Sequence, residues 1–337
     1  MKKADAVGLV YKVCQVRRLS RHTANSYAGW VGRYCEHLRG CGVGSSEDKV
    51  RLFLEGIAPV VAAATQNQAL NAVVFFYRDC LRQPLGQIGK WARARRAERL
   101  PTWLSGEEMR LLLDNMQGLA KLMAAFAYGT GLRLSELLGL RIKDVDVAAH
   151  LVTVRGGKGD KDRVTCLPHA LDLPLRQHLQ RVRVVYDRDR SEGRHGVYLP
   201  GGLERKFPNG GKEWPWFWMF PALGESVDPV SKVLRRHHVH EDTLGKALKA
   251  ACHKCGMGKR VSAHTLRHSF ATNMLTGGHS ITQVQELLGH TSVETTQVYL
   301  HCVPEFARAV VSPLDAGGKV LRFPGAFINP STLASNQ

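Results

Sequence analysis

The chain has 337 residues, enough for about two domains at the usual 100–200 residues each. Hydrophobic residues make up 44% of it, so it can bury a substantial core. The formal net charge of +18 is most simply explained by a polyanion partner, with nucleic acid as the first candidate. The sequence shows neither a signal peptide nor an apolar run that would span a membrane, so we expect no membrane partner. The eight cysteines do not resemble a disulfide framework, and we expect reduced thiols in the cytoplasm.

Residues 1–85 are predicted to form a helical domain that binds DNA. An apolar stripe at helical spacing runs through 27–38. Capping-box patterns that begin at Ser45 and Thr65 predict the starts of two further helices. Arginines on the polar faces are either an ordinary solvated surface or a phosphate-contacting one.

The apolar periodicity stops over residues 86–103, which we interpret as a basic linker. Its cations are Lys90, Arg93, Arg95, Arg96 and Arg99. A linker that crosses a phosphate backbone would make binding steeply dependent on salt, whereas a solvated tether would not.

A second domain is predicted over 104–315, followed by a C-terminal tail at 316–337. Ser105 opens it with a capping box. Arg133 lies in a glycine-flanked turn that leads into an apolar helix, where it could bind a ligand or form a salt bridge with Glu136.

The apolar period then changes from helix to strand. Short strand-like runs at 151–155 and 163–167 predict a β-hairpin with Lys158 and Lys161 near its tip. A long basic helix is expected from about Leu171 to Arg190.

An unusual aromatic segment follows, over about 191–238. It contains WPWFW at 214–218 and RRHH at 235–238. This segment is either an aromatic mini-core or a set of stacking surfaces for unpaired bases. A helix is expected over 241–255. The pair Cys252 and Cys255 near its end has no second C-x-x-C, so we expect no metal site.

The C-terminal part of this domain concentrates the chemically interesting side chains. A helix is predicted from near His264 to the glycine pair at 277–278, a second over 281–288, and a third that opens after Thr291 and carries Tyr299. His264 and Arg267 share one face of the first helix, at an N-terminus that favours anions. Together with His290 and Tyr299, they suggest phosphoryl chemistry through a covalent tyrosine intermediate.

Five stretches in this order resemble the tyrosine recombinase, or phage integrase, family. They are GTGLRLSELLGL, GGKGDKDR, HTLRHSFATNML, LLGH and the tyrosine nine residues after that last histidine, at positions 299 and 290. The resemblance implies a mainly α fold with a small β-hairpin, arranged as a two-domain C-shaped DNA clamp. It implies a catalytic set of Arg133, Lys158, His264, Arg267, His290 and Tyr299.

The resemblance also assigns roles to these residues. Tyr299 would form a 3′-phosphotyrosyl link, Arg133 and Arg267 would bind the phosphate oxygens, and His264 would accept the tyrosine proton. Lys158, at the hairpin tip, would protonate the leaving 5′ oxygen, and His290 would bind the phosphate. Neither metal, ATP nor another cofactor is expected. A helix over 303–315 would join subunits into a homotetramer on DNA.

Within that family, LERKFPN, WPWFW and RRHH resemble the integron integrases of bacteria, which recognise folded single-stranded as well as duplex sites to move gene cassettes. The resemblance implies that Trp216, His237 and His238 contact extrahelical bases. The alternatives are a duplex-specific recombinase, such as a phage integrase or chromosome-dimer resolvase, a type IB topoisomerase, and a catalytically silent DNA-binding protein.

Overall fold

The computed structural model describes residues 2–42, 44–86, 101–156, 162–229, 231–290 and 292–300. The chain divides into two compact units, Met1–Arg99 and Leu100–Gln337. None of the helices in the described ranges is long and apolar enough to cross a lipid bilayer. The expected contacts of Lys158 and of the subunit-joining segment at 303–315 lie outside these ranges, as do those of the linker cations Lys90, Arg93, Arg95, Arg96 and Arg99.

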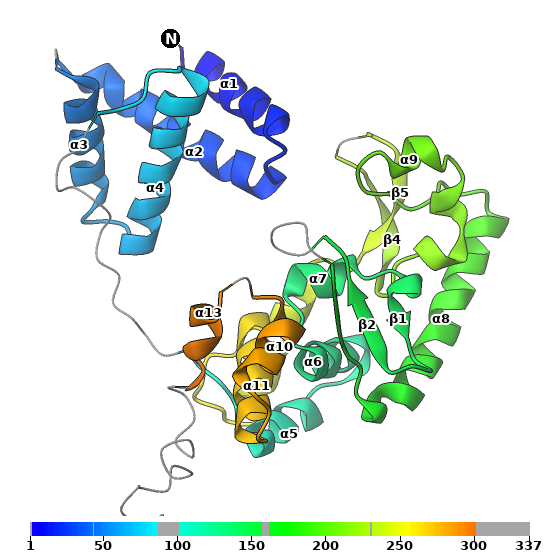
Figure 1. Cartoon of the computed structure of the whole chain (residues 1–337). Helices are drawn as coiled ribbons and strands as arrows, with labels where there is room; N and C mark the ends of the chain where they lie inside the picture. The colour runs from blue at the N-terminus through cyan, green and yellow to red at the C-terminus, as the bar shows by residue number, and fades with distance from the viewer. Residues whose placement is uncertain are drawn as a thin grey trace, which may run out of the picture. The chain divides into compact units, whose positions relative to one another are not determined.

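The first unit is a helical bundle (Figure 1). Its elements are α1 (Lys3–Val16), α2 (Arg21–His37), α3 (Ser46–Ile57), α4 (Ala63–Phe75) and the π-turn η2 (Phe76–Cys80). The central helix α2 packs against both α1 and α4. Tyr34 on α2 is fully buried, and its hydroxyl lies 2.9 Å from that of Tyr77, so the bundle contains a satisfied polar pair in its core.

One of the two predicted caps in this unit is confirmed and the other is wrong. The hydroxyl of Ser45 accepts a hydrogen bond from the Asp48 amide at the start of α3. Thr65, by contrast, lies inside α4, whose N-cap is Ala62 without a side-chain bond. A helix can begin early in this way because burial of its apolar face supplies more stability than one cap.

The second unit begins with three helices around its main core. They are α5 (Gly106–Asp114), α6 (Gly118–Thr130) and α7 (Leu134–Gly139). The predicted capping box at Ser105 is confirmed, because its hydroxyl accepts from the Glu108 amide and the Glu108 carboxylate accepts from the Ser105 amide. The core around α6 includes Leu104, Leu112, Phe126, Leu137 and Leu266, all of them fully buried.

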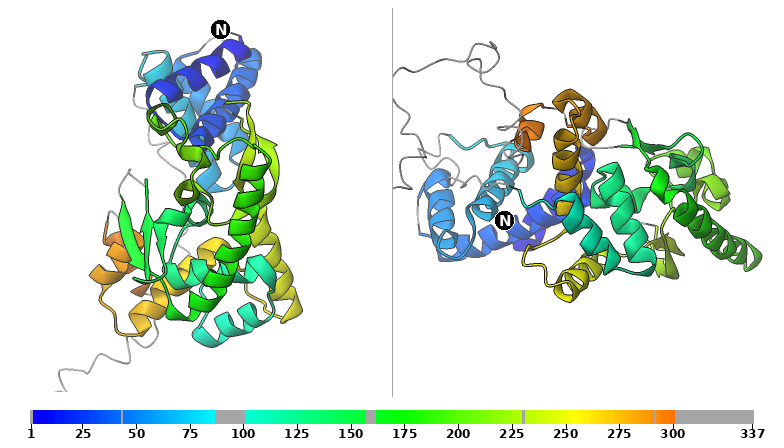
Figure 2. Two further views of the ribbon diagram at one scale, coloured as in Figure 1. Left: turned by 90° about the vertical axis from the view of Figure 1, so that its right-hand side faces the viewer. Right: turned by 90° about the horizontal axis from the view of Figure 1, so that it is seen from below.

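A three-stranded antiparallel sheet follows, in the order β1–β2–β3. Its strands are β1 (Val145–Asp146), β2 (Leu151–Val154) and β3 (Arg163–Cys166). The predicted hairpin is therefore confirmed, and Leu151 pairs with Cys166 at its base. The predicted long helix is also confirmed as α8 (Asp172–Ser191). Figure 2 shows the small sheet beside the C-terminal helices of this unit, where β3 contacts the helix over 281–288.

The aromatic segment after α8 contains a second sheet that the sequence did not reveal. This sheet is the antiparallel pair β4 (Pro221–Val227) and β5 (Leu234–His238), and the short helix α9 (Leu203–Lys206) precedes it. The 3₁₀ helices within the described residues are η1 (Leu38–Gly40), η3 (Ile142–Asp144), η4 (His169–Leu171), η5 (Gly210–Lys212) and η6 (Trp214–Trp216).

The C-terminal helices of the described chain are α10 (Asp242–Lys254), α11 (Ala263–Thr276), α12 (Ile281–Leu288) and α13 (Glu294–Gln297). The first three confirm the predicted ranges. Gly289 ends α12 with φ +63°, and a Cβ there would lie 2.7 Å from Cδ of Arg163. Only glycine fits both constraints, and the close approach brings β3 against the end of α12.

Candidate active site

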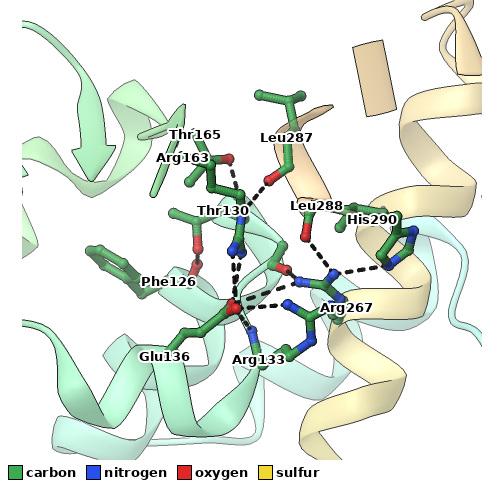
Figure 3. Close-up of polar contacts among 11 residues, drawn as sticks. Phe126, Thr130, Arg133, Glu136, Arg163, Thr165, Arg267, Leu287, Leu288 and His290 are labelled. Carbon is green, nitrogen blue, oxygen red and sulfur yellow. Dashed lines mark hydrogen bonds and ion pairs between the residues drawn. The ribbon is translucent and has the colours of Figure 1, made fainter. Parts of the chain in front are cut away.

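Glu136 is the centre of an ionic cluster built from three elements. It lies in the first turn of α7, where its carboxylate accepts the backbone amide of Arg133 at 2.9 Å and the guanidinium of Arg133 at 2.7 Å. Arg163 of β3 donates to both carboxylate oxygens, at 3.0 and 2.7 Å. Arg267 of α11 lies 3.8 Å away. Figure 3 shows the three guanidinium groups converging on this one side chain.

The cluster carries an excess of positive charge. Burial alone would raise the pKa of Glu136, but hydrogen bonds from Arg163 and Arg133 outweigh it and lower the pKa to about 2. Burial, together with repulsion from Arg133, lowers the pKa of Arg267 to about 10. Three guanidinium groups thus face one carboxylate, and their uncompensated charge favours a bound anion.

The side chain of Arg267 is only 3% exposed, and three hydrogen-bond partners hold its guanidinium in place. Its guanidinium donates to the carbonyl of Gly131 at 2.6 Å and to that of Leu288 at 2.7 Å. It also lies 3.0 Å from Nε2 of His290. Gly131 presents its carbonyl because it adopts φ +68°, and a Cβ there would lie 2.5 Å from the ring of Phe270.

Tyr299 lies in a turn after α13, so the prediction that a helix carries it is wrong. The helix ends at Gln297, and its N-cap is Val293 without a side-chain bond. The ring of Tyr299 packs in an apolar cluster with Phe270 and Leu288 and is only 4% exposed. The nucleophile proposed from the sequence is therefore buried in the free protein.

The hydroxyl of Tyr299 lies 2.9 Å from Nδ1 of His268, a residue that the sequence analysis did not select. The ring of His290 stacks on the same tyrosine at a centroid distance of 6.3 Å. Burial lowers the pKa of both histidines to about 4, with further repulsion from Arg267. Both imidazoles are therefore neutral near pH 7, and His268 can accept the phenolic proton in a hydrogen bond.

His264 occupies a different position from that expected of the tyrosine's partner. It is exposed at the N-terminus of α11, and its ring centroid lies 6.4 Å from that of His268. The sequence signal that could have identified His268 was its spacing, because it follows His264 by four residues and so shares its helical face. Arg163 ends the GGKGDKDR motif, but its contact with Glu136 is visible only in the fold.

The aromatic segment forms its own core, in which Trp214 and Trp216 are only partly buried. Phe217 and Trp218 are buried, and the guanidinium of Arg141 lies 3.2 Å from the centroid of the Trp218 ring. The rings of His237 and His238 lie 6.3 and 5.0 Å from that of Trp218.

Trp216 is only half-buried, and the ammonium of Lys143 lies 3.0 Å from its ring centroid. The mini-core expected as one alternative is therefore present. Trp216 combines an aromatic face with a nearby cation at its surface.

A buried tyrosine beside a cluster of three guanidinium groups is an arrangement suited to phosphodiester exchange. The sequence matches the family model "Phage integrase family" over residues 102–305 and "Phage integrase, N-terminal SAM-like domain" over residues 9–87. The chain therefore belongs to the phage integrase family of tyrosine site-specific recombinases and is a DNA strand transferase.

Individual relatives agree with this assignment. The chain is 43% identical over 305 residues to an "Integrase/recombinase" of Escherichia coli, a match that covers 88% of this chain and 89% of that protein. It is 31% identical to the "Tyrosine recombinase XerA" of Thermococcus onnurineus, covering 86% and 88% of the two chains.

Solved structures share the fold at lower identity. A XerH site-specific recombinase bound to a difH substrate gives a TM-score of 0.60 at 21% identity, covering 88% of this chain and 82% of that one. A lambda integrase dimer bound to a COC′ core site gives 0.57 at 15% identity, covering 88% and 94%.

Proposed function

We propose that Tyr299 attacks a scissile DNA phosphate held by Arg133 and Arg267. The uncompensated charge around Glu136, next to a buried tyrosine, is the observation that carries this proposal. A phosphate dianion-like transition state gains charge on its non-bridging oxygens, and a guanidinium fork can donate to two of them at once. His290, already 3.0 Å from Arg267, is proposed to donate a ring N–H to the same anion.

Proton transfer completes the proposed reaction. A phenol has a pKa of about 10, so it reacts slowly unless a base removes its proton. His264 accepts that proton in the assembled complex, and Lys158 delivers one to the leaving 5′ oxygen. The bond from phosphorus to the 5′ oxygen breaks as the phosphotyrosyl bond forms, so religation needs neither ATP nor a metal.

Because His268 contacts the Tyr299 hydroxyl in the free protein, the tyrosine must leave its buried position before it can react. The negative charge of an incoming phosphate would offset the repulsion between Arg267 and the neighbouring cations. The free energy gained in this way would be available for the movement of Tyr299.

Covalent trapping tests the catalytic proposal. The full-length protein is mixed with a nicked DNA site from which the cleaved 5′ product diffuses away, and adducts are counted on a denaturing gel. Tyr299→Phe should abolish the adduct and preserve DNA binding. Tyr11→Phe, at an exposed tyrosine of α1, is the matched control and should react as wild type. Adduct formation by the Tyr299→Phe protein would remove this residue from the reaction.

We further propose that the protein is of the integron integrase type and moves gene cassettes. The aromatic segment supports this reading, because Trp216 is half-buried, lies beside Lys143 and is followed in the chain by the β4–β5 pair. Stacking of an unpaired base on an aromatic ring contributes about 1–3 kcal/mol and tolerates any base. His237 and His238 support the ring of Trp218 and are proposed as further base contacts.

A competition between folded and duplex DNA tests the integron proposal. Trp216→Ala should weaken binding of a folded single-stranded hairpin site at least about fivefold and leave binding of a plain duplex unchanged. Leu223→Ala, at an apolar residue of β4 that is 90% exposed, is the control for loss of surface area without an aromatic ring. An equal loss on both DNA forms, or preference of the wild type for duplex, would favour a duplex-specific recombinase.

We propose a homotetramer on DNA joined through residues 303–315. Truncation after residue 302 should leave binding to a single site intact and eliminate the complex of four subunits with two sites, as measured by analytical ultracentrifugation. A tetramer that survives truncation would contradict this role of the segment.

A further inference from the structure

Three potential metal ligands meet at the end of the three-stranded sheet, and none of them is among the residues that contact Glu136. His150 ends the turn between β1 and β2, His169 lies in η4, and Asp172 is the first residue of α8. One ligand atom of each lies within 4.8 Å of the others. The expectation of no metal site rested on the lone C-x-x-C at Cys252 and Cys255 and did not consider these three residues.

The two best-placed atoms lie within ion-pair distance of each other but form no hydrogen bond. Nδ1 of His150 and Oδ1 of Asp172 are 3.4 Å apart, and each is a buried polar atom without a hydrogen-bond partner. Buried polar atoms are normally satisfied, so such a pair requires an explanation. Two ligands of a tetrahedral zinc ion at about 2.0–2.1 Å from the metal are separated by about 3.3 Å, which is close to the observed spacing.

A simple ion pair between His150 and Asp172 does not account for the third residue. The imidazole rings of His150 and His169 lie with their centroids only 3.6 Å apart, tilted by 46°. Two rings so close would repel each other if both were protonated, whereas two neutral imidazoles can bind one metal ion.

The backbone holds these groups in place at some cost. His150 adopts φ +56°, a left-handed conformation that is uncommon for residues other than glycine. Its carbonyl accepts the amide of Leu167 at 2.8 Å. Leu167 precedes His169 by two residues, so this bond holds His150 close to the segment that carries His169. A strained residue that the fold retains is a reason to look for a function.

We propose that His150, His169 and Asp172 bind a divalent transition-metal ion of the zinc class. Two imidazole nitrogens and one carboxylate oxygen suit Zn²⁺, Co²⁺ or Ni²⁺, whereas Mg²⁺ and Ca²⁺ prefer oxygen ligands. A water molecule would complete the tetrahedron. The ion connects the β1–β2 turn to the first turn of α8 and takes no part in strand cleavage.

Metal-dependent melting of the tag-free, full-length protein tests this site. At free Zn²⁺ of about a hundred times the dissociation constant, the melting temperature of the second unit should rise by about 5–10 °C, while Mg²⁺ at the same concentration should have no effect. His169→Gln and Asp172→Asn should each remove most of the rise. An unchanged melting temperature of the wild type would overturn the proposal.

His150→Gly separates metal binding from folding. Glycine adopts φ +56° without strain, so this variant should fold at least as well as wild type without metal and yet lose the rise with Zn²⁺. His240→Gln is the matched control. His240 is an exposed histidine 3.7 Å from Asp242, and its Nδ1 already accepts a hydrogen bond from the backbone amide of Asp242. It should keep the full rise.

Cobalt spectra distinguish this site from binding by cysteines. Co²⁺ at the proposed site should show visible bands of tetrahedral coordination without the ultraviolet charge-transfer band of a thiolate ligand. A thiolate band, or a melting rise that persists in all three site variants, would assign metal binding to cysteines and refute the proposal.

Discussion

Replacement of Glu136 by glutamine should destabilise the second unit strongly. The side chain is 7% exposed and is the carboxylate that contacts Arg133, Arg163 and Arg267. The fall of its pKa from the ordinary 4.5 to about 2 corresponds to about 3 kcal/mol of folding free energy, at about 1.4 kcal/mol for each tenfold change in acidity. Removal of one partner from a buried ion pair typically costs about 3–5 kcal/mol, which agrees with that figure.

Urea unfolding at pH 7, followed by circular dichroism, measures this loss. Glu286→Gln, at an exposed glutamate of α12, is the control and should change stability by no more than about 0.5 kcal/mol. If Glu136→Gln unfolds within about 1 kcal/mol of wild type, the carboxylate does not hold the cluster together and the reasoning fails.

The pH dependence of the same pair gives a second check. Because the folded state depresses the Glu136 pKa, its contribution is fully present above about pH 4.5 and is lost as the pH falls through about 2. The difference in stability between wild type and Glu136→Gln should therefore shrink over that window. A constant difference would indicate that the loss at pH 7 comes from altered packing.

Three further outcomes are expected. Arg267→Lys should slow single-turnover cleavage by about 10²–10³-fold with little change in DNA affinity, because lysine lacks the planar guanidinium fork that reaches both carbonyls and a phosphate. A rate within about tenfold of wild type would contradict this. Since folding lowers the pKa of His268 and His290 to about 4, stability should decline from about pH 6.5 to 4, and asparagine at both positions should flatten that decline in urea titrations. Glutamine at all five linker cations should lower the slope of log binding constant against log salt concentration for duplex DNA by up to about 4.5. A solvated tether would leave this slope unchanged. The cations are Lys90, Arg93, Arg95, Arg96 and Arg99.

The parts of the fold that depend on local signals could be predicted from the sequence. Helix α12 ends at Gly289 because the chain needs a left-handed residue there, and the hairpin of β2 and β3 follows from alternation around a glycine-rich turn. Helix α5 begins at the capping box of Ser105, whose two hydrogen bonds span three residues. Each of these elements is determined within a few neighbouring positions.

The parts that depend on distant contacts could not be predicted. The β4–β5 pair is stabilised across the chain, since the buried guanidinium of Arg236 donates to both oxygens of Asp189, 47 residues earlier. The role of His268 likewise needs Tyr299 to fold back over 31 residues. The helix expected to carry Tyr299 ends at Gln297, and the ring packs in the apolar cluster with Phe270, a contact between distant positions that no local pattern indicates.

The burial of Tyr299 has a consequence for the safety of the genome. A protein with a net charge of +18 binds DNA non-specifically wherever it meets it. With its proposed nucleophile 4% exposed and bonded to His268, we expect such an encounter to leave the strand intact. Strand breaks would then be confined to sites where binding contributes enough free energy to expose the tyrosine, and copies bound elsewhere on the chromosome would not cut it.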